Sequence, residues 1–425
     1  MSNVLEELKW RGLLHQATHE AALALHLQTG SRTFYTGFDP TADSITIGNL
    51  VPVMVMRHLQ RAGHRPIVLL GGGTGLIGDP SGKSAERQLQ DHVQVAHNVN
   101  SIGAIFRSLL DFDGPNAARI VDNFEWLSAL SYIEVLRDIG KHFSVNMMIQ
   151  KDSVRERLHN REQGISYTEF SYMILQSFDF LHLQRKRGVT LQMGGSDQWG
   201  NIVGGVDLVR RMEQSEVFGL TTPLVTKADG GKFGKTESGA IWLSPERTSP
   251  YAYYQFWMNT ADQDALAFLK IYTLLERSAI EALWQQHEAD PSARVAQRSL
   301  AREATLLLHG QAGLERAEAA TAALFSGNVA GLDLQTLEDA LRDAPATEHA
   351  LTSLDGDGLP LTDLLPQTSL ASSKREAREF LANGAVILNG TKADDKTRLT
   401  RDTLLHGTLA LLRRGKKNWH VTRWL

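Results

Sequence analysis

The stretch Pro66-Ile-Val-Leu-Leu70, which leads directly into Gly71-Gly-Gly73, decides the fold class of this chain. A continuous apolar run of this length suits a strand of a parallel sheet, because such strands are buried on both faces. Glycines that follow a strand mark a turn or a loop. We therefore predict a buried parallel strand that ends in a glycine-rich loop.

Strand-like and helical stretches alternate on both sides of this strand. Residues 32–38, 118–123 and 189–195 favour strands, whereas residues 48–63 and 167–183 have the apolar spacing of helices. Such alternation over about the first 220 residues is typical of an α/β domain with a mainly parallel sheet.

The second half of the chain has a different pattern. Residues 249–341 carry apolar residues at helical spacing, and residues 343–366 are rich in Asp, Gly, Pro and Thr, which is typical of a linker. Residues 367–425 indicate a small final α+β unit that begins with a helix over 374–383.

The composition is that of an ordinary globular protein with an uneven charge. Its 425 residues are 42% hydrophobic and include no Cys, which excludes disulfides, a catalytic thiol and Cys-ligated metal sites. The net charge is −4, but residues 371–425 hold 12 Lys and Arg against 5 Asp and Glu, a net of +7 that leaves −11 elsewhere. This basic end favours a phosphate-rich partner, although a solvated basic surface has the same composition. No secretory signal or membrane span is apparent, so we expect a cytoplasmic protein.

One glycine motif suggests a dinucleotide. Gly73-Thr-Gly75-Leu-Ile-Gly78 matches the G-x-G-x-x-G pattern of NAD-binding folds. That pattern must open a helix, and Pro80 and Gly82 interrupt any helix that starts there. An NAD-dependent enzyme is therefore disfavoured.

Two further motifs place cations near glycines. Residues 78–84 are one residue short of a P-loop, which removes that interpretation but keeps Lys83 and Arg87 as candidate phosphate contacts. Lys232-Phe-Gly-Lys235-Thr236 follows residues 223–231, which we predict to be a strand running into a turn. Two lysines three residues apart can close on a polyphosphate as point charges. Ordinary solvated loops are the alternative in both cases.

Taken in chain order, the motifs resemble those of bacterial tyrosyl-tRNA synthetases, which are class I aminoacyl-tRNA synthetases. The resemblance runs nearly end to end and includes a C-terminal unit similar to the S-four type of RNA-binding domain. The stretches that carry it are Tyr35-Thr-Gly37-Phe-Asp39-Pro-Thr41, Thr46-Ile-Gly48-Asn49, residues 71–81, residues 168–180 and Gln192-Met-Gly-Gly195-Ser-Asp197-Gln198-Trp199-Gly200-Asn201, together with Lys232 to Thr236.

The resemblance implies an architecture and a reaction. It implies a Rossmann-like catalytic domain over residues 1–230 and a helical anticodon-recognition domain over 231–342, which begins with Lys232 to Thr236, here called the lysine loop. It also implies the linker 343–366 and an S-four-like domain over 367–425. Tyrosine would attack the α-phosphate of ATP to give tyrosyl-adenylate and pyrophosphate, and the terminal ribose of tRNA(Tyr) would then take the tyrosyl group. Such chemistry depends on positioning and on cations directed at the developing charge.

The resemblance also assigns roles to individual residues. For catalysis it implies Lys83, Arg87, Lys232, Lys235, Thr41 and Thr46. For tyrosine it implies Tyr35, Asp79, Tyr172, Gln176, Asp179 and Gln192, with Tyr35 and Asp179 at the phenol hydroxyl. For ATP it implies Gly37, Asp39, Gly48, Asn49, Gly195, Asp197, Gln198 and Lys235. Tyr172, Gln176 and Asp179 are spaced by four and three, so one face of a helix can present all of them.

One motif departs from the family. Thr46-Ile-Gly48-Asn49 stands where the family usually has H-x-G-H, so both signature histidines are absent. Thr and Asn can still donate hydrogen bonds. The same form resembles tryptophanyl-tRNA synthetases, so tryptophan specificity is one alternative. A non-catalytic RNA-binding relative is another.

The basic end carries its own expectation. The helix over 374–383 begins with a Ser cap and carries cations in its first turns. Cations at a helix start oppose the helix dipole, so this placement favours an external anion. We predict RNA contacts at two groups of residues: Lys374, Arg375 and Arg378, and Arg413, Arg414, Lys416 and Lys417. By resemblance, a homodimer is implied, Mg²⁺ would arrive with ATP, and no protein-bound metal is expected.

Overall fold

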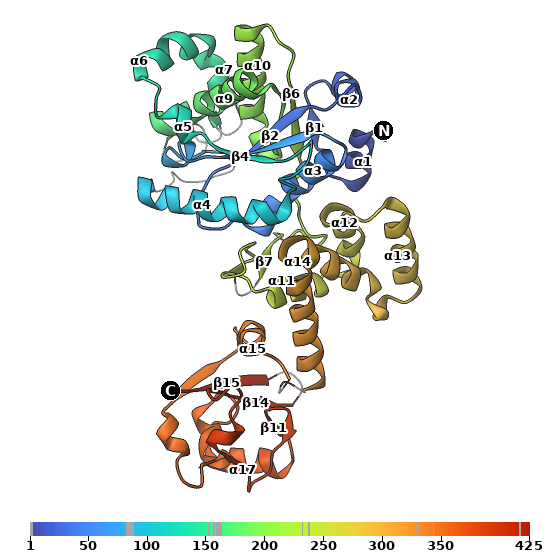
Figure 1. Ribbon diagram of the computed structural model, residues 1–425, viewed down its shortest axis with the longest axis vertical. Helices are drawn as coiled ribbons and strands as arrows, with labels where there is room; N and C mark the ends of the chain where they lie inside the picture. The colour runs from blue at the N-terminus through green and yellow to red at the C-terminus, as the bar shows by residue number, and fades with distance from the viewer. Residues whose placement is uncertain are drawn as a thin grey trace. The chain divides into compact units, whose positions relative to one another are not determined.

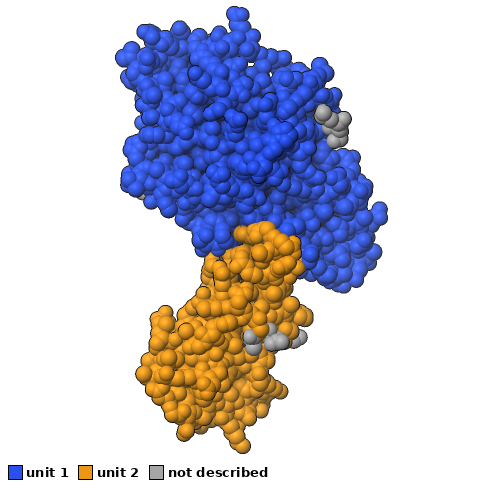
Figure 2. Space-filling view, viewed as in Figure 1, with its two compact units in different colours: residues 1–248, 257–308 blue, residues 249–256, 309–425 orange. Residues whose placement is uncertain are grey.

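The protein is described from a computed structural model. The structure describes residues 3–81, 89–151, 154–155, 158, 164–231, 233–236, 239–327, 329, 331–342, 344–415 and 418–425. The chain forms two compact units, shown in two colours in Figure 2. Unit 1 comprises residues 1–248 and 257–308, and unit 2 comprises residues 249–256 and 309–425.

Unit 1 is built on a six-stranded sheet with the order β1-β6-β5-β2-β3-β4. All neighbouring strands are parallel except β1, which runs antiparallel to β6. This confirms the predicted α/β fold with a mainly parallel sheet. The strands are β1 (Gln16–Ala17), β2 (Thr33–Phe38), β3 (Arg65–Leu70), β4 (Arg119–Asp122), β5 (Val189–Gly195) and β6 (Phe218–Thr222).

Strand β3 has the burial that its apolar run predicts, because its residues after Arg65 are all buried. The strand predicted within residues 223–231 is wrong, since the chain pairs earlier, over β6. All of β6 is buried, and the turn signals of residues 226–231 lie beyond it.

Helices cover both faces of the sheet. Figure 1 shows α4 on one face and α9 and α10 on the other. Ser166 caps the start of α9 by accepting from the Glu169 amide, and Gly188 ends it at φ 63°. The helices of this part are α1 (Val4–Arg11), α2 (Glu20–Gln28), α3 (Leu50–Arg61), α4 (His92–Leu109), α5 (Phe124–Leu127), α6 (Tyr132–Glu134), α7 (Val145–Ile149), α9 (Tyr167–Arg187) and α10 (Trp199–Glu213).

The strand order changes direction at β2. The chain runs from β2 outward through β3 and β4, and then returns to place β5 and β6 on the other side of β2. Tyr35 on β2 lies opposite Gln192 on β5 in the parallel register. The crevice beyond the carboxyl ends of β2 and β5 is where ligands bind in sheets of this kind.

Two helices of the predicted helical domain belong to unit 1 instead. These are α12 (Asp262–Tyr272) and α13 (Arg277–Ala289). Arg11 of α1 is buried and donates hydrogen bonds of 3.0 Å to the carbonyl oxygens of Lys270 and Thr273 and of 2.6 Å to that of Leu275. This guanidinium ties α1 to the turn between the two helices.

Unit 2 contains the small C-terminal sheet, with the order β12-β11-β14-β15-β9. Its strands are β9 (Ala346–His349), β11 (Val386–Leu388), β12 (Thr391–Lys392), β14 (Leu409–Arg414) and β15 (Asn418–Trp424), and β10 (Leu359–Pro360) pairs separately with β13 (Arg398–Leu399). Its helices are α15 (Leu334–Ala340), α16 (Leu361–Leu364) and α17 (Lys374–Ala382), while α11 (Pro250–Met258) and α14 (Val295–Ser326) span the unit boundaries.

The prediction of a linker over residues 343–366 is wrong for its described part. Strand β9 within it pairs in parallel with β15. Leu361, Leu364 and Leu365 are fully buried in a core with Leu381 and Leu412. The Asp, Gly and Pro content marks turns, but the leucines between them hold the segment in the folded unit. Across the described residues, no helix is both long and apolar enough to cross a membrane.

Candidate active site

One pocket of about 520 Å³ lies at the crevice between β2 and β5. The structure brings together around it every described residue that the sequence assigned to catalysis, tyrosine or ATP and whose side chain is placed. These are Tyr35, Gly37, Asp39, Thr41, Thr46, Gly48, Asn49, Asp79, Tyr172, Gln176, Asp179, Gln192, Gly195, Asp197 and Gln198. Lys83, Arg87 and Lys232 lie outside the described residues, and Lys235 is placed only as backbone in β7 (Lys235–Thr236).

Asp179 of α9 forms the buried end of the pocket. Its Oδ2 accepts from Nδ2 of Asn123 at 2.9 Å, and its Oδ1 accepts from Nε1 of Trp126 at 2.8 Å. Burial raises the pKa of Asp179 to about 7, against the effect of these two donors, which lower it. A carboxylate held in this way can accept a further hydrogen bond from a ligand hydroxyl.

Tyr35 contributes a second polar group to the buried end. Its ring is fully buried and its hydroxyl has no hydrogen-bond partner within the described part of the chain. Burial, and then the charge of Asp179, raise the pKa of this phenol well above its usual value, so it stays protonated. An unpaired buried hydroxyl costs free energy of about 1–3 kcal/mol. A polar ligand atom beside Asp179 would satisfy it.

A chain of hydrogen bonds runs from Asp179 across the pocket floor. Nδ2 of Asn123 also donates to Oγ1 of Thr74 at 3.0 Å, and Thr74 donates to Oδ1 of Asp39 at 2.8 Å. The hydroxyl of Tyr172 donates to Oδ2 of Asp39 at 2.8 Å. Burial and the nearby carboxylates raise the pKa of Tyr172, so its proton remains available for this bond. The network fixes Asp39 and Asp179 at the same time.

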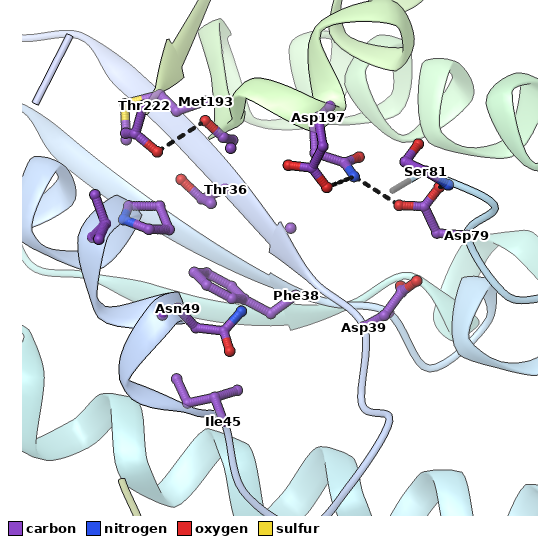
Figure 3. Close-up of a pocket in the computed structure, with 18 of the residues that line it drawn as sticks. Thr36, Phe38, Asp39, Ile45, Asn49, Asp79, Ser81, Met193, Asp197 and Thr222 are labelled. Atoms are coloured by element: carbon purple, nitrogen blue, oxygen red, sulfur yellow. Dashed lines mark hydrogen bonds between the residues drawn. The ribbon is translucent and has the colours of Figure 1, made fainter. Parts of the chain in front are cut away.

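A second group of polar side chains surrounds Asp79. Nε2 of Gln198 donates to Oδ2 of Asp79 at 2.7 Å, and the amide of Ser81 donates to Oδ1 at 2.9 Å. Asn201 donates to Oε1 of Gln176 at 3.0 Å. Figure 3 shows Asp39, Asp79 and Asp197 grouped at one end of the view. The buried carboxylate of Asp79, with Asp39 half-buried and Asp197 exposed, suits a cationic amino group.

The residues that replace the signature histidines bind each other. Thr46 donates its hydroxyl to Oδ1 of Asn49 at 3.0 Å, and the Thr46 amide donates to the same oxygen at 3.1 Å. The backbone amide of Asn49 donates to the Thr46 carbonyl at 2.9 Å, whereas its side-chain Nδ2 makes no hydrogen bond among the residues that the structure describes. This NH₂ group is therefore available as a hydrogen-bond donor at the pocket, where Figure 3 labels Asn49 among the lining residues.

The lysine loop is anchored by its aromatic residue. Phe233 stacks on Tyr272 with ring centroids 5.2 Å apart and packs edge-on against Phe268 at 4.9 Å. Beyond it, β7 pairs antiparallel with β8 (Gly239–Ala240). Phe233 also lines the pocket, so the described part of the lysine loop contacts the pocket at this residue.

Sequence reasoning missed several residues of the pocket. Asn123 and Thr74 were not singled out, although Asn123 ends one predicted strand and Thr74 lies in the loop after another, where a polar residue can reach a ligand. Trp126, which does not line the pocket but donates to Asp179, left no signal, because an isolated Trp is usually a packing residue. Thr36 faces the pocket from β2 with its buried hydroxyl unpaired in the described structure, and only its place beside Tyr35 could have indicated it.

The basic residues of unit 2 are used in two ways. Arg375 and Arg378 are exposed on α17, whereas Lys374 pairs with Asp363 at 2.7 Å, so its partner is an internal carboxylate. Arg413 is buried over the ring of Trp419 at 5.0 Å. Arg414 lies over Phe380 at 4.6 Å and donates to the Leu370 carbonyl. Lys416 and Lys417 lie outside the described residues. No three His, Asp or Glu side chains converge as a metal site in the described structure.

Both parts of the chain match known families. Residues 27–326 match the family described as tRNA synthetases class I (W and Y), and residues 336–422 match the tyrosine–tRNA ligase SYY-like C-terminal domain. The tyrosine–tRNA ligase of Aliivibrio salmonicida is 49% identical over 100% of this chain and 99% of its own, and that of Bacillus caldotenax is 48% identical over 99% and 100%.

Solved structures extend the comparison. A C-terminally truncated mitochondrial tyrosyl-tRNA synthetase from Aspergillus nidulans is 30% identical, with a TM-score of 0.70 over 76% of this chain and 95% of that chain. A tryptophanyl-tRNA synthetase from Plasmodium falciparum shares the fold at 16% identity and a TM-score of 0.53, over 73% of this chain and 84% of that chain. On the full-length identity and the two family matches, the chain belongs to the tyrosine–tRNA ligase family of class I aminoacyl-tRNA synthetases.

Proposed function

We propose that this protein is a tyrosine–tRNA ligase, which activates tyrosine with ATP and transfers it to the 3′-terminal ribose of tRNA(Tyr). One observation carries the substrate assignment: Asp179, held by Asn123 and Trp126, lies with the unpaired hydroxyl of Tyr35 at the buried end of the pocket. This pair suits a phenol hydroxyl. Relatives named tyrosine–tRNA ligase, which align over nearly the whole chain, support the reaction.

Tryptophan is disfavoured by the same groups. An indole in this pocket would place carbon atoms beside Asp179 and Tyr35, which would leave a buried carboxylate and a buried hydroxyl without a ligand partner. Each such unpaired group costs about 1–3 kcal/mol, which is a large penalty relative to tyrosine. The non-catalytic alternative is disfavoured because the residues proposed for tyrosine and ATP are assembled around one pocket.

The remaining pocket residues divide between the two substrates. Asp79, Tyr172 and Gln176 would hold the α-amino group of tyrosine, and Gln192 its carboxylate region. Gly37, Asp39, Gly48, Gly195, Asp197 and Gln198 would receive the nucleotide, because glycines permit close approach and the side chains bond a ribose. Thr41 and Asn49 would contact the phosphates, with Thr46 orienting Asn49.

Cations and Mg²⁺ would neutralise the departing pyrophosphate. Lys83, Arg87, Lys232 and Lys235 are proposed for this role from their motifs. Mg²⁺ would enter on the phosphate oxygens of ATP, as part of the substrate. The chain's own contribution is then to orient the tyrosine carboxylate and the α-phosphate and to donate hydrogen bonds as charge develops.

The proposal extends to tRNA and to a second copy of the chain. The helical segment within residues 231–342 would meet the anticodon, and Arg375 and Arg378 of unit 2 would contact phosphates. A homodimer is proposed from exposed apolar side chains that occur along the chain from α6 to the start of α9. These are Tyr132, Ile133, Leu136, Val145, Met147 and Tyr167. Large exposed apolar groups that lie together mark an interface. The setting would be the cytoplasm.

Charging of a mixed bacterial tRNA pool tests the whole proposal. We expect labelled tyrosine, but not labelled tryptophan, to become attached to tRNA in an ATP-dependent reaction. Attachment of tryptophan instead would replace the substrate assignment. Tyrosine-dependent adenylate without any charging would show that the first step survives and that the RNA part of the proposal is wrong.

A further inference from the structure

A short backbone ladder connects the Thr46–Asn49 motif to the lysine loop. The Ile47 amide donates to the Ile241 carbonyl at 3.0 Å, and the Ile241 amide donates to the Gly234 carbonyl at 3.0 Å. The Leu243 amide donates to the Ile45 carbonyl at 2.9 Å. Residues 241–243 therefore form a connector that contacts both segments.

The two segments are also in direct contact. Gly234 has φ 78°, and a Cβ built on it would lie 2.5 Å from Cγ2 of Ile47. Trp242 on the connector forms an isolated antiparallel bridge with Thr46. Trp242, Thr46, Asn49 and Phe233 all line the pocket. A displacement of the connector would thus move both phosphate-facing segments.

Arg247 fastens this connector from outside the pocket. Its guanidinium lies over the Trp242 ring, 4.4 Å from the centroid, and its Nε pairs with Oδ1 of Asp43. Asp43 stands three residues before Thr46, so one side chain holds the connector and the start of the motif loop together. Arg247 itself does not line the pocket.

We propose that Arg247 is a positioning residue for the activation step, acting through Trp242 and Asp43 to keep Asn49 and the lysine loop in register around the phosphates. This inference rests on the proposed function. Asp43 and Arg247 are each 39% exposed, so their pair is screened by solvent and contributes little to the stability of the whole unit. Its effect should appear in catalysis, since small misplacements of reacting groups cost rate.

The kinetic test compares Arg247→Met with Arg247→Lys in ATP–pyrophosphate exchange. We expect Arg247→Met to lower kcat on the order of tenfold, with the KM for tyrosine and the melting temperature unchanged. Arg247→Lys keeps a cation over Trp242 and should recover part of the loss. Arg185→Met removes another half-exposed ion pair of unit 1, with Glu213, and should leave kcat unchanged.

A double-mutant cycle tests the role of Asp43, the ion-pair partner of Arg247. Asp43→Asn should lower kcat in the same direction, and the double variant Asp43→Asn with Arg247→Met should be no worse than Arg247→Met alone, because both changes break one link. A kcat for Arg247→Met within twofold of the unsubstituted protein would overturn the inference. So would a parallel rise in the KM for tyrosine, since that would place the defect at the tyrosine end.

Hydrogen exchange provides a readout that does not depend on activity. In Arg247→Met, peptides that cover residues 43–49 and 239–243 should both exchange faster than in the unsubstituted protein, while strand β3 should be unchanged. Faster exchange in one segment alone, or in neither, would overturn the coupling. If the unsubstituted protein showed no tyrosine-dependent ATP–pyrophosphate exchange, that result would count against the proposed function. Hydrogen exchange would still decide whether Arg247 couples the two segments.

Discussion

Nδ2 of Asn123 donates a hydrogen bond of 2.9 Å to Oδ2 of Asp179. The oxygen of the same amide accepts from the Gly73 amide at 2.7 Å. Asn123, directly after β4, therefore joins the glycine-rich loop after β3 to the carboxylate on α9. Three segments far apart in sequence meet at one amide, and the buried end of the pocket depends on it.

Replacing Asp179 should weaken tyrosine binding selectively. In Asp179→Asn the negative charge is lost, and the new amide can leave Trp126 or Asn123 facing a donor. A buried donor without an acceptor costs about 1–3 kcal/mol, so we expect the KM for tyrosine to rise by about 5- to 150-fold, with the KM for ATP much less affected. Steady-state exchange kinetics measure both. An unchanged KM for tyrosine would remove Asp179 from the tyrosine subsite.

Tyrosine binding should depend on pH through Asp179. Burial raises the pKa of this carboxyl from 3.8 to about 7. Below about pH 7 the carboxyl is protonated and loses its capacity as a charged acceptor, so the KM for tyrosine should rise as the pH falls from 8 to 6. The free energy of unfolding has the opposite pH dependence. Because the pKa of Asp179 is raised in the folded protein, the contribution of this group to folding stability is lost as the pH rises from about 4 to 7.

Asn123→Ala checks the origin of that pH dependence. The amide stabilises the ionised form of Asp179, so its removal should move the midpoint of the tyrosine profile to higher pH. Titration of the substrates is common to both proteins and cancels in the comparison. A midpoint that stays fixed in Asn123→Ala would assign the pH dependence to another group.

Gly234→Ala should impair activation more than its backbone strain explains. Ala at φ 78° is strained by about 1–2 kcal/mol. Its Cβ would also press on Ile47 beside Asn49, so we expect kcat for exchange to fall at least tenfold. Gly230→Ala is the matched control, because Gly230 has φ 79° with no atom within 4 Å of its added Cβ. Equal losses in the two variants would contradict the contact argument.

The proposed dimer can be tested with two equally exposed residues. Ile133 on α6 belongs to the exposed apolar residues proposed for the dimer and is 66% exposed, while Leu25 on α2 is 63% exposed. Sedimentation should show that Ile133→Arg shifts the protein to monomer and that Leu25→Arg does not, since a charge is costly only where a partner buries it. A dimer that withstands Ile133→Arg would move the interface elsewhere.

The exposed arginines of α17 should affect charging and not activation. Replacing Arg375 and Arg378 by Gln removes two phosphate contacts, so tRNA charging should weaken and its salt dependence should become shallower. Exchange of ATP and pyrophosphate should be unaltered. Arg401→Gln, an exposed change in the same unit that breaks a pair with Asp355, is the control. Truncation near residue 355 is a poorer test, because it removes core leucines of unit 2.

The sheet and much of the pocket could be predicted from local sequence. The apolar run of β3 and the glycines that end β5 indicated where buried strands end, and parallel strands place those ends at one edge. Spacings of four and three put Tyr172, Gln176 and Asp179 on one helical face. Such periodic patterns can be read from the sequence because each depends only on the geometry of one helix or strand.

What could not be predicted depends on pairings between distant segments. Nothing near Gly234 indicates that Ile47 lies against it, and nothing near Arg11 indicates the carbonyl groups of residues 270–275 that place two helices in unit 1. Arg413 carries the same charge as Arg375, yet it is buried against Trp419. Composition cannot separate an internal cation from one that faces an external anion.

The most direct test of the central claim is ATP–pyrophosphate exchange with purified protein and tyrosine, tryptophan or phenylalanine as the sole amino acid. The account predicts exchange with tyrosine only, since the hydroxyl is what Asp179 and Tyr35 are placed to bind. Phenylalanine would leave the Tyr35 hydroxyl unpaired and Asp179 without a ligand partner, as tryptophan would. Exchange with tryptophan or phenylalanine at a rate comparable to tyrosine would contradict the assignment of the buried end of the pocket.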